Sequence, residues 1–178
     1  MEQRYDLSGS LLHWYDYNKR ILPWRENKDP YRIWISEIML QQTRVEAVKP
    51  YFDRFMEALP TVYDLAKVDD DRLMKLWEGL GYYNRARNLK AAAQTIVEEY
   101  GGQLPADYDK LLSLKGIGMY TAGAIGSIAF ELQVPAVDGN VLRVLTRLWG
   151  DDSDILKDKT KKAMGRRVME FMPEDRPG

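Results

Sequence analysis

The stretch Leu114-Lys115-Gly116-Ile117-Gly118-Met119-Tyr120-Thr121-Ala122 connects one predicted helix, Tyr108–Leu114, to the next, Met119–Glu131. Two glycines separated by one residue allow a sharp turn, and the second helix begins directly after them. The backbone N–H groups at such a helix start point outward together and suit an anion, of which phosphate is the best candidate. A plain tight turn between two core helices would use the same glycines, so other residues must decide between the two interpretations.

Small side chains keep the second of these helices thin. They are Thr121, Ala122, Gly123, Ala124 and Gly126. A thin helix lets another group approach its backbone closely. That group is either something bulky or a closely packed neighbouring helix, and the sequence leaves both open.

A carboxylate, Asp138, lies in Val137-Asp138-Gly139-Asn140, a short distance after the hairpin. An aspartate directly before a helix is most often a helix N-cap. Capping also fixes the side chain and favours its anionic form, so the structural and functional roles are compatible. An anion held in this way would stabilise a developing positive charge.

A second acid, Glu37, lies within a predicted helix among apolar neighbours on one face. Three or four residues away are Ile33, Trp34, Leu40 and Gln41. Burial on this stripe would raise the pKa of Glu37 and make it a general acid near neutral pH. The alternative is a glutamate at the edge of the stripe, paired with Arg25, Arg32 or Arg44. One neutral and one anionic acid form a suitable pair for breaking a bond to a sugar carbon.

Aromatic residues occupy a glycine-rich turn in Gly79-Leu80-Gly81-Tyr82-Tyr83, and Arg85 and Arg87 follow. Exposed rings beside arginines suit stacking on bases or wedging between them. Buried tyrosines at a helix start are the alternative. Gln41-Gln42 would either reach base edges or cap the end of their helix.

Composition narrows the possible chemistry. The 178 residues contain no cysteine and one histidine, His13, which argues against thiolate or histidine metal sites and a Ser-His-Asp triad. The net charge of −1 does not decide whether nucleic acid is a partner. The start, Met1 to Asp6, is too polar for a signal peptide, and the weakly polar run Tyr120–Phe130 is far shorter than the ~20 residues of a membrane span. We therefore expect a cytoplasmic protein with no membrane partner.

Apolar spacing is helical almost throughout, which predicts an all-α array of short helices. The predicted helices are Leu7–Lys19, Pro30–Gln42, Arg44–Ala58, Asp70–Glu78, Asn84–Tyr100, Tyr108–Leu114, Met119–Glu131, Gly139–Leu148 and Lys157–Met172. The predicted N-caps are Asp29, Thr43, Thr61, Asp69, Asp107 and Asp138. Pro50 should kink or split the third helix. The basic run Lys157 to Arg167 is interpreted as a solvated helix face.

Together, these segments resemble the helix-hairpin-helix superfamily of DNA glycosylases, and within it the adenine glycosylases of the MutY type. The matching segments are Leu22-Pro23-Trp24-Arg25, Trp34-Ile35-Ser36-Glu37-Ile38-Met39-Leu40-Gln41-Gln42-Thr43, the Gly79–Tyr83 turn, Gly116 to Ala122, and Val137 to Val141. The resemblance runs from about Leu12 to Gly178. It implies a monofunctional enzyme that hydrolyses the glycosidic bond of adenine opposite 8-oxoguanine or guanine in double-stranded DNA. A glycosylase for another mismatched base such as thymine, or a non-catalytic DNA-binding module, is the alternative.

The resemblance also implies a role for each site residue. Glu37 is the expected general acid, Asp138 stabilises the sugar cation, Asn140 orients Asp138 and water, and Tyr120 stands where bifunctional relatives carry a lysine. The expected contacts to the extruded base are Trp24, Arg25 and Leu40. The expected contacts to DNA are Gln42, Tyr82, Gly116, Gly118 and Thr121, and of these Gln42 and Tyr82 are expected to wedge the duplex beside the opposing purine. Backbone carbonyls of Leu112, Leu114 and Ile117 are a candidate site for a monovalent cation.

The same resemblance predicts two lobes. Residues 21–131 form a six-helix-type lobe with the helix-hairpin-helix at 108–131, and residues 1–20 and 132–178 form parts of an incomplete terminal lobe. Lys115 replaces a usual proline and Met119 a common arginine. Full-length relatives continue with a four-cysteine 4Fe-4S loop and a further domain, so the chain is interpreted as a shortened, monomeric form without a cofactor of its own.

Overall fold

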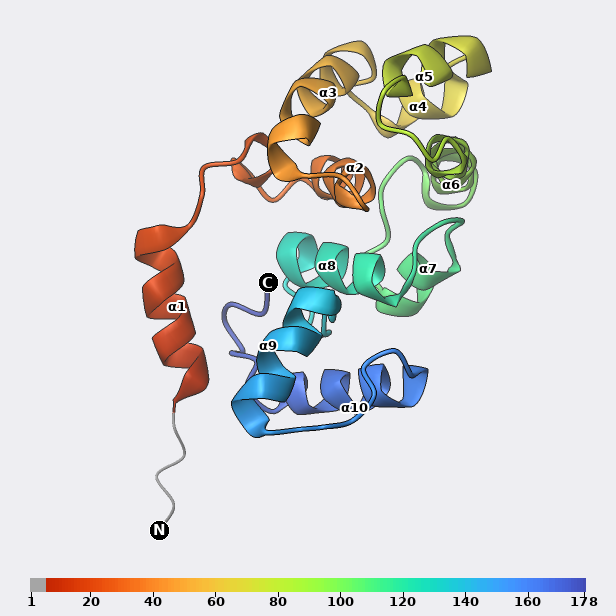
Figure 1. Ribbon diagram of the computed structural model, residues 1–178. Coiled ribbons are helices and arrows are strands. Elements are labelled where there is room, and N and C mark those ends of the chain that lie inside the picture. The colour runs from red at the N-terminus through yellow and green to blue at the C-terminus, as the bar shows by residue number, and fades with distance from the viewer. Residues whose placement is uncertain (1–5) are drawn as a thin grey trace.

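The computed structural model describes residues 6–178, which fold into helices and connecting loops without a β-strand. Figure 1 shows the arrangement, and the all-α prediction is confirmed. The elements are α1 Leu7–Asn18, the 3-10 turn η1 Pro23–Arg25, α2 Pro30–Leu40, α3 Val45–Ala58, α4 Val62–Lys67, α5 Asp70–Trp77, α6 Asn84–Tyr100, α7 Tyr108–Ser113, α8 Met119–Phe130, α9 Gly139–Trp149 and α10 Asp158–Met169.

Five of the six predicted N-caps are present. Asp29 accepts hydrogen bonds from the N–H groups of Tyr31 and Arg32, and Thr61 forms a reciprocal capping box with Asp64. Asp69, Asp107 and Asp138 also cap their helices. The prediction for Thr43 is wrong, because α3 begins one residue later, after Arg44, and has no side-chain cap.

Two short elements, η1 and α4, were not predicted from the sequence. The six residues of α4 are too few to show a clear helical period. The predicted split at Pro50 is also wrong, because α3 continues through it. Val48, Phe52 and Phe55 are completely buried on both sides of the proline, and this packing holds the helix together.

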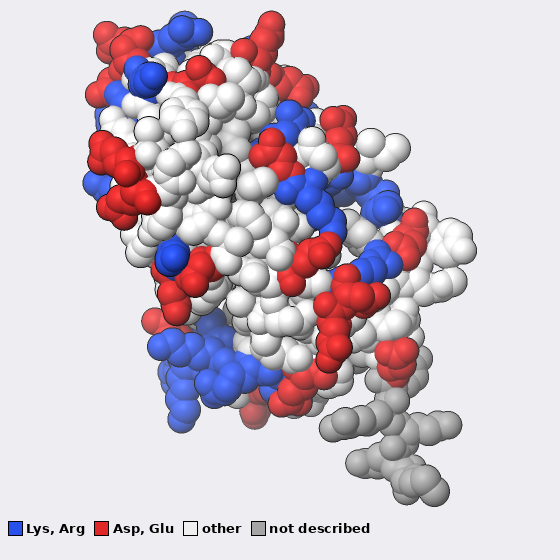
Figure 2. Space-filling view, turned by 180° about the vertical axis from the view of Figure 1, so that it is seen from behind, with Lys and Arg blue, Asp and Glu red and all other residues white. Residues whose placement is uncertain are grey.

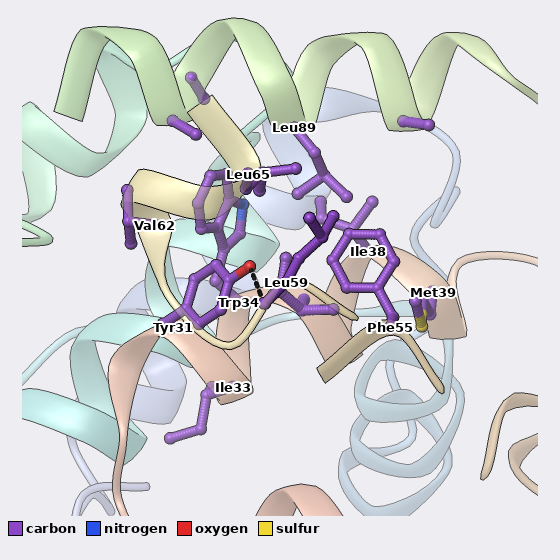
Figure 3. Close-up of a cluster of buried hydrophobic side chains, with 14 of the residues drawn as sticks. Tyr31, Ile33, Trp34, Ile38, Met39, Phe55, Leu59, Val62, Leu65 and Leu89 are labelled. Carbon is purple, nitrogen blue, oxygen red and sulfur yellow. Dashed lines mark hydrogen bonds between the residues drawn. The ribbon is translucent and has the colours of Figure 1, made fainter. Parts of the chain in front are cut away.

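The hydrophobic core lies within residues 24–125, and α2 supplies much of it. All the residues from Ile33 to Met39 are buried. Figure 3 shows the cluster around Trp34, Phe55 and Leu89, with the Tyr31 hydroxyl donating a 2.9 Å hydrogen bond to the carbonyl of Leu59. Since α2 also packs against α8, the core fixes the helix that carries Glu37 relative to the hairpin.

The terminal helices pack much less tightly. α1 contains no buried residue and stands to one side of the other helices in Figure 1. It is tied to the C-terminal segment by a hydrogen bond from the Ser8 hydroxyl to the carbonyl of Phe171 and by Arg176, which donates to Asp16 at 2.7 and 3.0 Å. The predicted terminal lobe includes residues 1–5, which lie outside the described part of the chain.

Basic side chains gather at the end of the molecule where α10 lies (Figure 2). Several are paired with carboxylates nearby: Lys161 with Asp158 at 3.3 Å, and Arg167 with Asp151 at 3.2 Å. The other basic side chains of α10 are exposed, which fits the interpretation of a solvated helix face. Within residues 6–178, no helix has the length and apolar character needed to cross a bilayer.

Candidate active site

The predicted hairpin is formed by α7, a glycine turn and α8. Gly116 has φ +81°, and a Cβ there would lie 2.7 Å from the Cβ of Asn88 on α6, so this position needs glycine for both its conformation and its space. Gly118 is the N-cap of α8 and has no side chain to satisfy the first amides. Those amides are therefore suited to an external acceptor such as phosphate.

Glu37 lies in the middle of α2 and is only 4% exposed. The hydroxyl of Tyr120, in the first turn of α8, donates a 2.9 Å hydrogen bond to its Oε2. The guanidinium of Arg25, from η1, lies 3.6 Å from its Oε1. Three separate elements therefore meet at one carboxyl group, and of the three arginines considered as partners, Arg25 lies beside it.

The surroundings of Glu37 favour its neutral form. Burial raises its pKa above the ordinary value, and the negative charge of Asp138 acts in the same direction. The hydrogen bond from Tyr120 and the charge of Arg25 oppose this increase but do not cancel it. The result is a buried acid that retains its proton to a higher pH than an exposed glutamate.

The second acid, Asp138, caps α9. One carboxylate oxygen accepts from the backbone N–H of Val141 at 2.8 Å, and the other accepts from the side-chain amide of Asn140 at 2.9 Å. These bonds fix the orientation of the carboxylate at a helix N-terminus, where a negative charge is favoured. Because its charge raises the pKa of both Glu37 and Tyr120, the two acids belong to the same electrostatic environment.

The small side chains of α8 leave room for the loop that follows this helix. A Cβ on Gly123 would overlap the carbonyl oxygen of Pro135, and one on Gly126 would lie 2.9 Å from a methyl group of Val134. The segment before Asp138 therefore packs directly on α8. At both glycines the close neighbour is this loop, and not the packed helix that was the alternative to a bulky ligand.

A separate feature is an open hollow of about 780 Å³, which is lined by residues from the end of α2, the start of α6 and the glycine-rich turn. Its lining residues are Gln41, Gln42, Tyr82, Tyr83, Asn84, Arg85, Arg87 and Asn88. Tyr82 is 67% exposed and Tyr83 39%, so the alternative of buried tyrosines is wrong. Gln42 and Tyr82, the two predicted wedge residues, line the same hollow.

The other predicted site residues differ in accessibility. Trp24 is buried and packs edge-on against Phe52, where it supports the turn that carries Arg25. Leu40 is half-buried against the core. The Thr121 side chain is buried, so a contact with DNA would have to use its backbone amide. The carbonyl of Leu114, one of the candidate cation ligands, accepts from the N–H of Ile117 at 3.1 Å.

The role of Arg85 is not predicted from the sequence, in which it appears only as a basic neighbour of the aromatic turn. Its guanidinium donates to backbone carbonyls of both α2 and that turn. The available signal is an arginine in the first turn of a helix that follows Gly-x-Gly, and this pattern alone does not distinguish a half-buried residue that binds backbone carbonyls from a surface charge.

No side chain of this chain fits an iron–sulfur cluster, because the sequence has no cysteine. Among residues 6–178 there is also no group of three or more acidic or histidine side chains arranged to hold a metal ion.

An all-helical fold that brings a glycine hairpin beside a buried acid defines the helix-hairpin-helix class of DNA repair folds. Residues 35–171 match the family described as HhH-GPD superfamily base excision DNA repair protein, and the chain belongs to this family. The adenine DNA glycosylase of Homo sapiens is 42% identical over 96% of this chain and 33% of that protein. The adenine DNA glycosylase of Buchnera aphidicola subsp. Acyrthosiphon pisum is 45% identical over 88% of this chain and 45% of that protein.

Solved structures give the same fold. A thermostable thymine-DNA glycosylase has a TM-score of 0.87 and 29% identity, covering 96% of this chain and 78% of that one. An endonuclease III trapped in a covalent intermediate with DNA has a TM-score of 0.77 and 25% identity, covering 94% and 76%. The chain thus spans a third to under a half of the two adenine glycosylases above, but about three quarters of these solved enzymes.

Proposed function

We propose that this chain carries the catalytic portion of a monofunctional adenine DNA glycosylase that acts, as a monomer, on adenine opposite 8-oxoguanine or guanine in double-stranded DNA. The observation that carries the proposal is the position of Glu37, which is buried, hydrogen-bonded by the hairpin residue Tyr120 and under the electrostatic influence of Asp138. The names of the sequence relatives support adenine as the base.

The reaction divides between the two acids. The Glu37 carboxyl donates its proton to N7 of the extruded adenine, which makes the base a better leaving group. The bond between the base and the sugar carbon then breaks, and its electron pair leaves with the base. The anionic Asp138 stabilises the positive charge left on the sugar.

Water completes the reaction. The Glu37 carboxylate accepts a proton from a water molecule as the water oxygen bonds to the sugar carbon, which restores the acid. Asn140, which donates to Asp138, keeps that carboxylate oriented during this step. Tyr120 offers a phenol and no amine, so no covalent imine to the sugar forms and strand cleavage is not expected.

Thymine removal from a mismatch is a second candidate, favoured by the similarity to the thymine-DNA glycosylase at a TM-score of 0.87. A non-catalytic DNA-binding module is less well supported. Burying a carboxyl group has an energetic cost, and binding alone gains nothing from placing Glu37 at 4% exposure.

The test is single-turnover base release from duplexes that carry adenine opposite 8-oxoguanine, guanine or cytosine, and thymine opposite guanine. We expect release of adenine from the first two duplexes. Glu37→Gln should lower the rate by at least about a hundredfold while duplex affinity is retained. Glu98→Gln, the same change at an exposed position of α6, is the matched control and should leave the rate unchanged.

Three outcomes would overturn the proposal. Preferential release of thymine would assign the second candidate. Duplex binding without release of any base would assign the binding module. Equal loss of binding and of base release in Glu37→Gln would show that this residue is structural.

A further inference from the structure

Arg85 connects two segments that are far apart in the sequence. One guanidinium nitrogen donates to the carbonyls of Ile38 at 2.8 Å and Gln41 at 2.6 Å, at the end of α2. The other donates to the carbonyls of Leu80 at 2.9 Å and Gly81 at 3.2 Å, in the glycine-rich turn. The carbonyls at the end of a helix lack partners within it, so Arg85 satisfies them and ties them to the turn.

The carbonyls of Gln41 and Gly81 have a special position. Each belongs to the residue directly before a non-glycine residue with a left-handed backbone: Gln42 with φ +61° and Tyr82 with φ +48°. Such conformations are unfavourable for residues with a side chain and persist where the surroundings hold them. The same guanidinium therefore holds the peptide group that precedes each strained residue.

Aromatic contacts strengthen this arrangement. The guanidinium carbon of Arg85 lies 5.4 Å from the ring centre of Trp77 and 5.7 Å from that of Tyr82. The indole N–H of the buried Trp77 donates to the carbonyl of Gly81 at 3.0 Å. The Gly81 carbonyl is thus fixed from two sides, and Arg85 contacts both the Tyr82 ring and its backbone.

We infer that Arg85 is a positioning residue that sets the separation and orientation of the Gln42 and Tyr82 side chains, so that both enter the duplex together beside the extruded nucleotide. This inference rests on the proposed function. Gln42 and Tyr82 line one hollow but come from segments separated by 39 intervening residues, and Arg85 is the side chain that bonds to both segments. A planar guanidinium can bridge them, whereas the compact ammonium of lysine cannot reach both sets of carbonyls.

The decisive experiment makes two measurements. The first is the fluorescence of a 2-aminopurine base placed next to the mispair, which rises when that base is unstacked. The second is the rate of single-turnover adenine release. Arg85→Lys keeps the positive charge and the aliphatic stem. We expect it to lose most of the fluorescence increase and to lower the rate of adenine release at saturating protein by about ten- to a hundredfold. Arg72→Lys, the same change on the exposed face of α5, is the matched control and should change neither measurement.

A double-mutant cycle separates positioning from general destabilisation. If Arg85 acts through the wedge residues, Arg85→Lys should cause little further loss, within about twofold, once Tyr82→Ala has removed one of them. A residue that merely stabilises the fold would give the same fold-loss in both backgrounds, and that result would overturn the inference. Unchanged fluorescence in Arg85→Lys would overturn it as well.

The measurement also separates this inference from the proposed function. Unstacking requires no base release, so it can be repeated in the Glu37→Gln background. If the unaltered protein neither unstacks the probe nor releases adenine, the proposed function fails. If it does both and Arg85→Lys behaves like the unaltered protein, only the role of Arg85 fails.

Discussion

The two candidate catalytic acids belong to regions that are built differently. Glu37 lies on a helix buried along most of its length, inside a core drawn from residues 24–125. Asp138 lies near the start of the region 132–178, in which α9 and α10 bury only Leu142, Met164 and Gly165. One acid is held by packing and the other by hydrogen bonds and by the contact of its preceding segment with α8.

Because of this difference, we expect mutations in the two regions to affect different properties of the protein. Changes in the packed region should act first on folding, and through folding on Glu37. Changes around Asp138 should act first on the position of that carboxylate, with little effect on the stability of the whole chain.

The largest effect is expected in the core. Phe55 is completely buried and packs edge-on against Trp77, so Phe55→Ala should lower the free energy of unfolding by about 3–5 kcal/mol. Leu142→Ala, in the less tightly packed region, should cost about 2 kcal/mol, at the low end for such a change. Urea unfolding monitored by tryptophan fluorescence measures both. Equal costs would mean that the terminal region is as well packed as the core.

A smaller effect is expected at the contact between the regions. Gly123→Ala would push the carbonyl of Pro135, and with it the segment leading to Asp138, away from α8. We expect base release to slow by about tenfold or more. Gly165→Ala is the matched control, because its Cβ would lie 3.5 Å from the Pro135 ring, an ordinary contact. If both variants retain full activity, the Gly123 contact does not position Asp138.

Sequence reasoning succeeded where a single local rule determines the structure. An aspartate before a helix predicted the caps at Asp29, Asp69, Asp107 and Asp138, and apolar spacing predicted α6 with its observed bounds. It could not choose among the three arginines beside Glu37 or find the clamp at Arg85. Both depend on how distant segments fold together, which no local period encodes.

The tyrosine hydroxyl beside Glu37 should determine the pH profile. A general acid works while protonated, so base release should fall as pH rises through the pKa of Glu37. The hydrogen bond from Tyr120 lowers that pKa, and Tyr120→Phe removes it. The pKa should rise further, and the falling limb of the profile should move to higher pH.

Rates of base release measured across the pH range test this shift. Tyr63→Phe removes a comparable hydroxyl, which donates to the carbonyl of Gly101, and should leave the profile unchanged. A falling limb that moves to lower pH in Tyr120→Phe would mean that Glu37 does not act as the acid.

The smallest effect follows from the cost of burying Glu37. Because the pKa of Glu37 is raised on folding, the folded chain binds a proton at this residue more tightly than the unfolded chain does. This tighter proton binding stabilises the folded chain at low pH, and the stabilisation is lost as pH rises through the raised pKa. Glutamine does not titrate. Glu37→Gln should therefore unfold at a higher temperature than the unaltered protein at neutral pH, and the difference should shrink at acid pH. For a chain of this size, about 1 kcal/mol corresponds to 2–4 °C.

Glu98→Gln, at an exposed position, should show no such pH-dependent difference. A lower unfolding temperature for Glu37→Gln at every pH would mean that the contact with Arg25 outweighs the cost of burial, and would remove the reason for expecting a neutral acid on α2.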